Sequence, residues 1–517
     1  MRELVYHRQL LPTVERYADR VAFFDGEYTA TFGQHLNRVG RLSAALRGLG
    51  VGPGDRFAVM APNSHQYLEA YHAAFLGAGV VNPLNLRLAA PELEYILADS
   101  GTRVCFVDAF FAPLIERVRG AAGLEHVVLI GAGDAPHDHS YEELLAAADA
   151  VIPAEPEEED PVVLMYTGGT TGLPKGVLLD HRAEMLNAYH VLQTWSFTPD
   201  DVFLHQTPMF HAASMGGILG IPAIGASSVF LSLFDPGKVP GLVEQHGVTA
   251  TVMVPTMIGM MLAHPEFAAE RLATLRTLTY GASPMPADLL DRLLTLFPDL
   301  DVFQGYGMTE ASAVLTALLP EDHRVGGERL RSAGRAVRGV ALSIQGPDGE
   351  ILPNGETGEV CARAGNFMRE YWNKPEATEE AFRGGWYHTG DAGYLDAEGY
   401  LFLVDRVKDM IVTGGENVYS VEVENAISSH PAVAQVAVIG IPSEQWGEAV
   451  HAIVVPVEGA EVTEAEIIDH AREAIAGYKV PKSVEFRNEP LPLSGAMKVL
   501  KRDLRAPYWE GRDRAVN

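Results

Sequence analysis

Apolar and polar positions alternate along the chain in a way that predicts strands connected by helices. We interpret Leu275 to Tyr280 as a strand; Gly281 follows as a turn, and Val302-Phe303 begins the next strand. Between these two strands, apolar residues recur at helical spacing at Leu289, Leu290, Leu293, Leu294 and Phe297. Such a βαβ unit is typical of a mainly parallel sheet with helices on its faces. Residues 30–100 show a similar alternation, so we predict an α/β fold.

The C-terminal part of the chain has a pattern of its own. Strands are predicted at Val433–Ile439, His451–Val457 and Ser483–Phe486, and a helix is predicted at Glu464–Ala476. This is enough for a separate small domain. We therefore predict a large N-terminal domain over residues 1–405 and a small α+β domain over residues 406–517.

One uncharged stretch, Met209 to Phe234, is long enough to cross a bilayer. It contains four glycines and Pro222, and it ends in the β-rich run Ser228 to Leu231. We interpret it as a buried helix that leads into a buried strand. The N-terminal residues lack the apolar segment of a signal peptide. A cytoplasmic enzyme without a membrane span is expected.

Composition narrows the function classes. The chain has 517 residues and a net charge of −29, which argues against a nucleic-acid-binding protein. Its only cysteines, Cys105 and Cys361, lie far apart in sequence and match no metal-ligand spacing. We interpret both as buried, reduced thiols.

The strongest local signal is the segment from Tyr166 to Val177, which reads YTGGTTGLPKGV. Its glycine amides and threonine hydroxyls can surround phosphate oxygens, and Lys175 adds a positive charge. It is not a Walker A loop, because no Gly-Lys-Ser/Thr ends it. On composition alone, a flexible surface loop is the alternative.

Further motifs follow in a fixed order, and together with this loop they resemble those of the adenylate-forming superfamily. They are Gln304–Glu310, Thr389–Asp391, Val404–Asp409 and Leu491–Arg502. That superfamily includes acyl-CoA synthetases, peptide-synthetase adenylation domains and firefly luciferases, and the resemblance covers almost the full chain. It implies a large domain of mainly parallel sheets with a small, mobile C-terminal domain.

The resemblance also implies ligands and site residues. ATP, its product AMP, Mg²⁺ and coenzyme A are the implied ligands. Glu310 is implied to help hold Mg²⁺, and Asp391 to bind the two ribose hydroxyls. Tyr306 is implied to stack near adenine, Thr309 to contact the α-phosphate, and Lys408 to be the hinge between the domains. The remaining nucleotide-site residues implied are Thr167, Gly168, Gly169, Thr170, Thr171, Gly172, Lys175, Gly281, Ala282, Ser283, Gln304, Gly305, Gly307 and Arg406, with Thr170 counted as catalytic.

A second group of residues is implied on the coenzyme A side. Gly414 and Gly415 resemble the loop that forms part of the pantetheine tunnel. His211 lies in the segment where the acyl and thiol tunnels meet, so it is a candidate gate or polar group near the thiol; a buried structural histidine is the alternative. Lys479 and Lys482 on the small domain could meet the phosphates of coenzyme A.

The segment Leu491–Arg502 resembles the family's C-terminal lysine loop, which implies that Lys498 bridges the carboxylate and the α-phosphate during adenylation. Here the sequence departs from the family, because Met497 stands where glycine is usual. Glycine would let the loop adopt backbone angles that methionine disfavours. Lys501 and Arg502 are predicted to face solvent.

We predict an AMP-forming acyl-CoA ligase that acts on a hydrophobic monoacid. The alternatives are a ligase that only thioesterifies a preformed adenylate, a stand-alone enzyme that loads a carrier protein, a luciferase-type oxygenase, and a non-catalytic binding protein. No membrane span and no nucleic-acid partner are expected, and a homodimer is left open. Candidate pocket residues are small and apolar: Met253, Val254, Gly281, Ala282, Gly305, Met308 and Val314.

Overall fold

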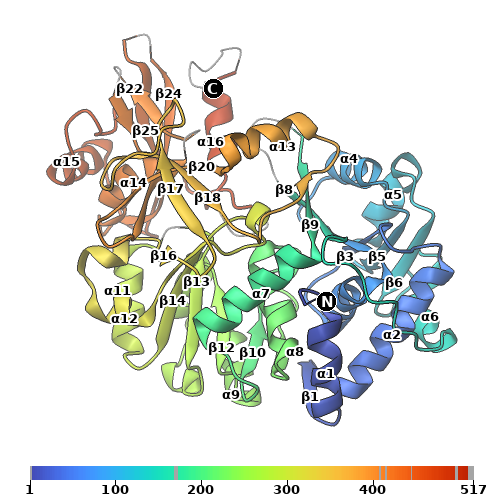
Figure 1. Ribbon diagram of the computed structural model, residues 1–517. Coiled ribbons are helices and arrows are strands. Elements are labelled where there is room, and N and C mark those ends of the chain that lie inside the picture. Colours follow the sequence, from blue (N-terminus) through green and yellow to red (C-terminus); the bar gives the residue numbers. More distant parts are fainter. Residues whose placement is uncertain are drawn as a thin grey trace.

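The computed structural model describes residues 3–167, 173–283, 285–406, 409–413, 416–443, 445–494 and 499–510, with the backbone alone at 405, 406, 416 and 417. Within these ranges the strands form four sheets, of nine, eight, four and five strands. The sheets of nine and eight strands belong to the large domain, and the five-stranded sheet lies in the C-terminal domain at one end of the molecule (Figure 1).

The nine-stranded sheet of the described chain is mainly parallel. Its strands β1, β11, β10, β12, β13 and β14 pair in parallel, and antiparallel strands stand at both edges. The order is β16 (Arg335–Ala336), β15 (Thr316–Leu318), β14 (Asp301–Tyr306), β13 (Thr277–Gly281), β12 (Ala250–Met253), β10 (Val202–His205), β11 (Ser227–Phe230), β1 (Val21–Asp25) and β2 (Tyr28–Thr31).

The eight-stranded sheet in the described residues has the same character. Strands β8, β4, β3, β5, β6 and β7 are parallel, whereas β9 and β19 continue the sheet antiparallel. The order is β19 (Glu370–Tyr371), β9 (Lys175–Asp180), β8 (Pro161–Thr167), β4 (Val80–Pro83), β3 (Arg56–Met60), β5 (Val104–Asp108), β6 (His126–Ile130) and β7 (His139–Ser140).

The two smaller sheets are mainly antiparallel. One joins β17 (Ala341–Gln345), β18 (Gly358–Arg363), β20 (Tyr387–Leu395) and β21 (Leu401–Arg406). The C-terminal sheet joins β23 (Glu416–Val418), β22 (Ile411–Thr413), β25 (Gly447–Pro456), β24 (Val433–Ser443) and β26 (Ser483–Phe486). The boundary predicted after residue 405 falls at the end of β21 and stays a prediction.

Helices cover both large sheets and the C-terminal sheet (Figure 1). In the N-terminal half they are α1 (His7–Tyr17), α2 (Phe32–Gly48), α3 (His65–Ala73), α4 (Ala90–Ser100), α5 (Ala112–Ala122), α6 (Tyr141–Ala147), α7 (His181–Trp195), α8 (Ile221–Ala223) and α9 (Val239–His246). Further along the chain they are α10 (Pro255–Ala263), α11 (Ala287–Leu296), α12 (Pro320–Val325), α13 (Pro375–Ala381), α14 (Ser420–Ser428), α15 (Glu464–Ala474) and α16 (Lys501–Arg505).

The predicted elements are confirmed where the apolar pattern was strongest. The βαβ unit is β13, α11 and β14, with β13 and β14 parallel. The uncharged stretch is mostly buried as far as Leu231, but its helical part is broken into the short segments η2 (Ala212–Ser214), η3 (Gly216–Gly220) and α8 before β11. Throughout the described residues, helices long and apolar enough to span a membrane are absent.

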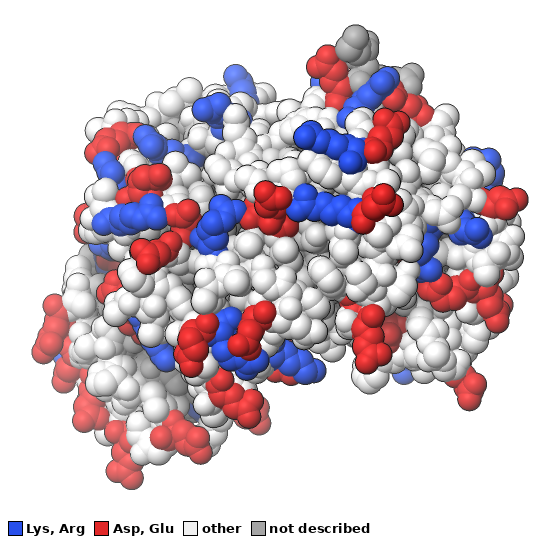
Figure 2. Space-filling model, turned by 90° about the horizontal axis from the view of Figure 1, so that it is seen from below, with Lys and Arg blue, Asp and Glu red and all other residues white. Residues whose placement is uncertain are grey.

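The largest hydrophobic core joins the two large sheets through the helices between them. Phe23 and Phe230 come from the nine-stranded sheet, and Phe57 and Phe106 from the eight-stranded one, and all four are almost completely buried. The C-terminal domain has its own core around Ile411, Val438 and Val450. On the face in Figure 2, acidic and basic side chains lie interspersed.

One correction concerns Lys501. Its ammonium lies 2.7 Å from Glu424 Oε1 and donates to Ser420 Oγ at 2.6 Å. Only 15% of its side chain is exposed, whereas 54% of the Arg502 side chain is. The prediction of a solvent-facing residue was therefore wrong for Lys501, because the partly buried carboxylate of Glu424 on α14 forms an ion pair with it.

Helix α7 carries a buried carboxylate. Glu184 has no exposed surface, and among the described residues neither of its oxygens has a hydrogen-bond partner. Burial, and then the neighbouring Asp180 carboxylate, raise the pKa of Glu184 well above its ordinary value. The folded protein therefore keeps a proton on Glu184 at a pH where the unfolded chain has lost it.

We expect Glu184→Gln to stabilise the protein at neutral and alkaline pH. Because the folded pKa is raised, the wild type loses free energy of unfolding as pH rises above the ordinary glutamate value, by up to about 1.4 kcal/mol per pH unit. Urea unfolding across about pH 4 to pH 8 measures this difference, and the exposed Glu143→Gln is the control. A difference between wild type and Glu184→Gln that does not change with pH would contradict the assignment.

Candidate active site

The glycine- and threonine-rich loop is carried by two strands at one side of the eight-stranded sheet. Thr167 at the end of β8 and Lys175 at the start of β9 are register partners, and Thr167 Oγ1 donates to the Lys175 carbonyl at 3.4 Å. The predicted phosphate-binding residues Gly168, Gly169, Thr170, Thr171 and Gly172 lie outside the described residues. The two strand ends determine where that loop starts and returns.

Tyr371 connects the base of this loop to the predicted metal ligand. The Lys175 ammonium lies 4.6 Å from the centre of the Tyr371 ring, and Tyr371 Oη donates to Glu310 Oε1 at 2.9 Å. Burial and then the Glu310 carboxylate raise the pKa of Tyr371, so its hydroxyl keeps the proton that it donates. The buried Tyr387 lies beside it, with 3.4 Å between the two hydroxyl oxygens.

Glu310 itself belongs to a short 3₁₀ turn, η5 (Thr309–Ala311), whose continuation is strained. Ser312 and Ala313 have φ values of 54° and 123°, which non-glycine residues rarely adopt. The fully buried Asn366 holds this bend, because its side-chain amide donates to the carbonyls of Ala311 at 2.7 Å and Val314 at 3.0 Å. Strain maintained by buried contacts is a feature of functional sites.

The predicted adenine and ribose residues contact each other. Tyr306, the last residue of β14, donates its hydroxyl to Asp391 Oδ2 at 2.7 Å. Asp391 lies on β20, where it is mostly buried, and its backbone is the register partner of Arg406 on β21. The contact therefore joins the nine-stranded and the four-stranded sheets, and it orients a carboxylate that can accept two ribose hydroxyls.

The glycines of β13 and β14 permit a close approach of the two strands. Gly281 and Gly305 are register partners, and a Cβ at Gly281 would lie 2.2 Å from the Gly305 carbonyl oxygen. At Gly307 a Cβ would lie 1.8 Å from the Ala313 carbonyl oxygen, so a side chain is excluded there too. Ala282 follows with a φ of 67°, and Ser283 comes next. These residues form the C-terminal ends of parallel strands, the place where open α/β sheets bind ligands.

Other predicted site residues are placed as follows. Gln304 on β14 accepts from Tyr280 Oη at 3.4 Å, and Thr309 begins η5 next to Glu310. Of the candidate acyl-pocket residues, Met253, Val254 and Val314 are buried, and Met308 packs against the main core. The side chain of Arg406, together with Lys408, Gly414, Gly415, Met497 and Lys498, lies outside the described residues.

Two residues predicted on the coenzyme A side have local partners. His211 Nδ1 accepts the Ala213 amide at 3.2 Å and so caps η2. Lys479 forms an ion pair with Glu422, with its ammonium 2.7 Å from both carboxylate oxygens. A coenzyme A phosphate would have to compete with Glu422 for this lysine, so the role of Lys479 stays a prediction.

Sequence reasoning missed Tyr371, Tyr387 and Asn366. Tyr371 lies on the two-residue strand β19, Tyr387 begins β20, and Asn366 lies in a loop, and only the fold brings them close to η5. A tyrosine that lies on a two-residue edge strand leaves no periodic pattern in the sequence.

We expect Tyr371→Phe to weaken ATP binding in the presence of Mg²⁺. The variant loses a hydrogen bond to a charged acceptor, which contributes about 1.5–3 kcal/mol, so KM for ATP should rise about tenfold or more while the fold is kept. Initial rates against ATP concentration measure this change, with the exposed Tyr478→Phe as the matched control. Equal KM values in both variants would show that Tyr371 does not position Glu310.

These features define an adenylate-forming enzyme, and comparisons with known proteins agree. The family model described as AMP-binding enzyme matches residues 11–372, and the model described as AMP-binding enzyme C-terminal domain matches residues 422–498. The chain belongs to the AMP-binding enzyme family, and the predicted fold is confirmed.

Individual relatives define its activity more closely. The chain is 41% identical to a feruloyl-CoA synthase from Amycolatopsis sp over 93% of this chain and 95% of that protein. It is 36% identical to the fatty acid–[acyl-carrier-protein] ligase ScoC of Streptomyces coeruleorubidus, over 95% and 93% of the two chains. The crystal structure of ATP-bound MatB from Rhodopseudomonas palustris superimposes with a TM-score of 0.88 at 30% identity, over 98% of this chain and 99% of that one. The prediction of an AMP-forming acyl-CoA ligase is confirmed at the level of the enzyme class.

Proposed function

We propose that this AMP-forming acyl-CoA ligase activates a hydrophobic monocarboxylic acid, most favourably one with an aromatic ring. The acid attacks the α-phosphate of ATP to form an acyl-adenylate and pyrophosphate. The thiol of coenzyme A then attacks the acyl carbon and AMP leaves. The observation that carries the adenylation chemistry is the connected set of contacts from Lys175 through Tyr371 to Glu310.

The nucleotide would bind between this set and the Tyr306–Asp391 pair. Asp391 would accept the ribose hydroxyls, and the Tyr306 ring would lie against adenine. Lys175 and the loop that follows Thr167 would neutralise phosphate charge. The hydrogen bond between Tyr306 and Asp391 then orients the carboxylate before ATP arrives, which lowers the entropic cost of binding.

Glu310 is the residue proposed to hold Mg²⁺. A carboxylate and phosphate oxygens are the hard ligands that Mg²⁺ prefers, and Tyr371 occupies only Oε1 in the hydrogen bond between them. When bound, Mg²⁺ would neutralise charge on the phosphates. Glu310 would orient the polyphosphate, and the strained bend at Ser312 and Ala313 would keep its carboxylate in place.

Lys498 is proposed to act in the first half-reaction only. A mobile ammonium can neutralise both the carboxylate of the acid and the α-phosphate as charge develops between them. In the second half-reaction the small domain would rotate about Lys408, and Gly414 and Gly415 would approach the pantetheine chain. Rotation about a few hinge residues is a common mode of domain movement.

The acid is proposed to lie beside β13 and β14. Gly305 leaves space, because a Cβ there would meet only the Trp195 ring at 3.8 Å. Met253 and Val254 are apolar and buried, and the candidate pocket residues include no lysine or arginine for a second carboxylate. Such a pocket favours a monoacid with an apolar body. The feruloyl-CoA synthase at 41% identity supports an aromatic acid.

The test is AMP formation from ATP and Mg²⁺ with a panel of acids, each with and without coenzyme A. The panel holds a 3-arylpropenoic acid, a benzoic acid, a long-chain fatty acid and a dicarboxylic acid of similar length. We expect sustained AMP production only when a hydrophobic monoacid and coenzyme A are both present. Production of ADP, or equal rates with the dicarboxylic acid, would overturn the proposal.

A carrier protein is a second candidate acceptor, and the likeness to ScoC favours testing it. Purified acyl-carrier protein replaces coenzyme A in the same assay. Faster thioester formation on the carrier protein than on coenzyme A would make it the acceptor. A homodimer and a cytoplasmic location stay predictions.

A third candidate follows from Met497, which would make adenylation inefficient and leave thioester formation from a supplied adenylate. We expect Met497→Gly to raise the adenylation rate about tenfold, because glycine restores backbone freedom next to Lys498. Pyrophosphate release measures that rate, and Ala496→Gly is the control for added flexibility alone. An unchanged rate in Met497→Gly would show that methionine at this position does not limit adenylation.

A further inference from the structure

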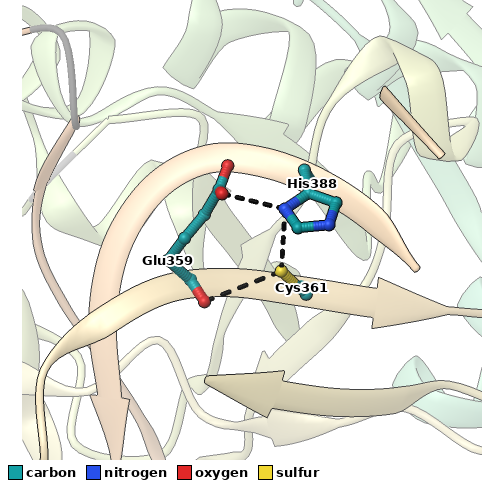
Figure 3. Close-up of side chains that lie close together, drawn as sticks. All are labelled: Glu359, Cys361 and His388. Carbon is teal, nitrogen blue, oxygen red and sulfur yellow. Dashed lines mark hydrogen bonds and ion pairs between the residues drawn. The ribbon is translucent and has the colours of Figure 1, made fainter. Parts of the chain in front are cut away.

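Three side chains with metal-binding atoms converge on one face of the four-stranded sheet. Cys361 on β18 and His388 on β20 are register partners, and Glu359 lies two residues before Cys361 on the same strand face (Figure 3). Within the described part of the chain, this is the one group of three or more His, Cys, Asp or Glu side chains that converge so closely. The adenylation chemistry proposed above does not use these residues.

The distances between these side-chain atoms are short enough for all three to bind one cation. His388 Nδ1 lies 3.3 Å from Cys361 Sγ and 2.8 Å from Glu359 Oε2, and the three ligand atoms lie within 4.8 Å of one another. The second ring nitrogen, His388 Nε2, lies 3.2 Å from the Arg383 carbonyl and can donate to it. Metal-binding histidines usually donate their other N–H in this way, which turns the free lone pair toward the metal.

We propose that Glu359, Cys361 and His388 bind a thiophilic divalent cation such as Zn²⁺. One thiolate, one imidazole and one carboxylate are ligands that Zn²⁺ accepts, and a water molecule completes a tetrahedral shell. On binding, the Cys361 thiol releases its proton to solvent and the sulfur binds the cation. Mg²⁺ is disfavoured, because it prefers oxygen ligands.

Arg383 contacts both this site and a neighbouring cleft. Its guanidinium donates to Glu359 Oε2 at 2.7 Å and also lies 3.0 Å from Glu380 Oε1, so it has a second carboxylate partner when Glu359 turns to a cation. Arg383 also lines an open cleft together with Glu376, Glu379, Glu380, Phe382 and Gly384. The glutamates at this cleft attract cations to the entrance.

Metal binding would change the position of a residue in the proposed nucleotide site. Glu359 Oε1 accepts the Gly390 amide at 3.2 Å, and Gly390 directly precedes Asp391. A cation that draws Glu359 and His388 together would therefore shift the bend that presents Asp391. This consequence, unlike metal binding itself, rests on the proposed function.

Cobalt titration of the full chain without ATP or Mg²⁺ tests the site. Co²⁺ bound to a thiolate gives a sulfur-to-cobalt charge-transfer absorption band. We expect this band to saturate at one Co²⁺ per chain in the wild type, to remain in Cys105→Ser, and to disappear in Cys361→Ser. Absence of the band in the wild type, or its retention in Cys361→Ser, would overturn the proposal. Thermal unfolding midpoints establish that both variants fold.

Competition and kinetics complete the test. Zn²⁺ should displace Co²⁺ and abolish the band, and His388→Gln should weaken Zn²⁺ binding about tenfold or more. In the enzyme assay we expect Zn²⁺ to raise KM for ATP in the wild type and in Cys105→Ser but not in Cys361→Ser. Equal inhibition of all three proteins would contradict the coupling to Asp391. The absorption band needs no turnover, so a failure of the proposed enzyme activity leaves the metal-site test intact.

Discussion

Replacing Lys498 with alanine should lower the rate of adenylate formation about 10²–10³-fold, while conversion of a preformed acyl-adenylate and coenzyme A to thioester stays close to the wild-type rate. The magnitude is that of removing one preorganised electrostatic contact to the transition state. The expected asymmetry follows from the proposed role of the ammonium, which would neutralise two anions that approach each other only in the first half-reaction. Pyrophosphate release measures the first step, and thioester formation from synthetic acyl-adenylate measures the second.

The control for this prediction is Lys482→Ala, which removes an exposed lysine from the same domain. It should leave adenylation unchanged. If Lys498→Ala lowers both half-reactions equally, the lysine acts on the structure of the whole enzyme and its proposed role is wrong. If neither half-reaction changes, another cation neutralises the α-phosphate.

Glu310→Gln should have the second large effect, a loss of about 10²–10³-fold in kcat/KM for ATP in the adenylation step. The amide keeps the shape of the side chain, but it removes the negative charge that would hold Mg²⁺ against the phosphates. Tyr371 can still donate to the amide oxygen, so the local hydrogen bond is kept. A larger loss than in Tyr371→Phe is expected, because the charge is lost and not only its orientation.

Adenylation rates across a Mg²⁺ titration measure this effect, and the exposed Glu321→Gln is the matched control. We expect the Mg²⁺ concentration at half-maximal rate to rise in Glu310→Gln alone. A lower rate with an unchanged Mg²⁺ dependence would mean that Glu310 acts on the fold of the bend at Ser312 rather than on the metal.

The sequence predicted the parts of this account that depend on local patterns. In the βαβ unit β13–α11–β14, the helix has an apolar stripe at helical spacing and Gly281 marks the turn after the first strand, so its elements were predictable. The candidate nucleotide residues Tyr306 and Asp391 each lie in a short motif, and the fold brings the two into contact. Their role in nucleotide binding stays a prediction. Strand β26 was predicted at its observed bounds.

Other features depend on contacts between distant segments. Tyr371 reaches Glu310 across 61 residues and Asn366 reaches Ala311 across 55, and neither belongs to a recognisable pattern. Lys501 was misjudged because a basic residue in a polar segment gives no sign of a carboxylate on another helix. Glu184 occupies a helix position that sequence polarity alone would assign to the surface.

The central claim is that the acid is activated as an acyl-adenylate, and an isotope experiment tests it most directly. Both carboxylate oxygens of the acid are labelled with oxygen-18, and the acid is incubated with ATP, Mg²⁺, coenzyme A and the enzyme. The masses of the products are then measured by mass spectrometry. One labelled oxygen should appear in the phosphate of AMP and one should remain in the thioester carbonyl, because the attacking carboxylate oxygen leaves with AMP. Unlabelled AMP, or ADP as the nucleotide product, would contradict the account.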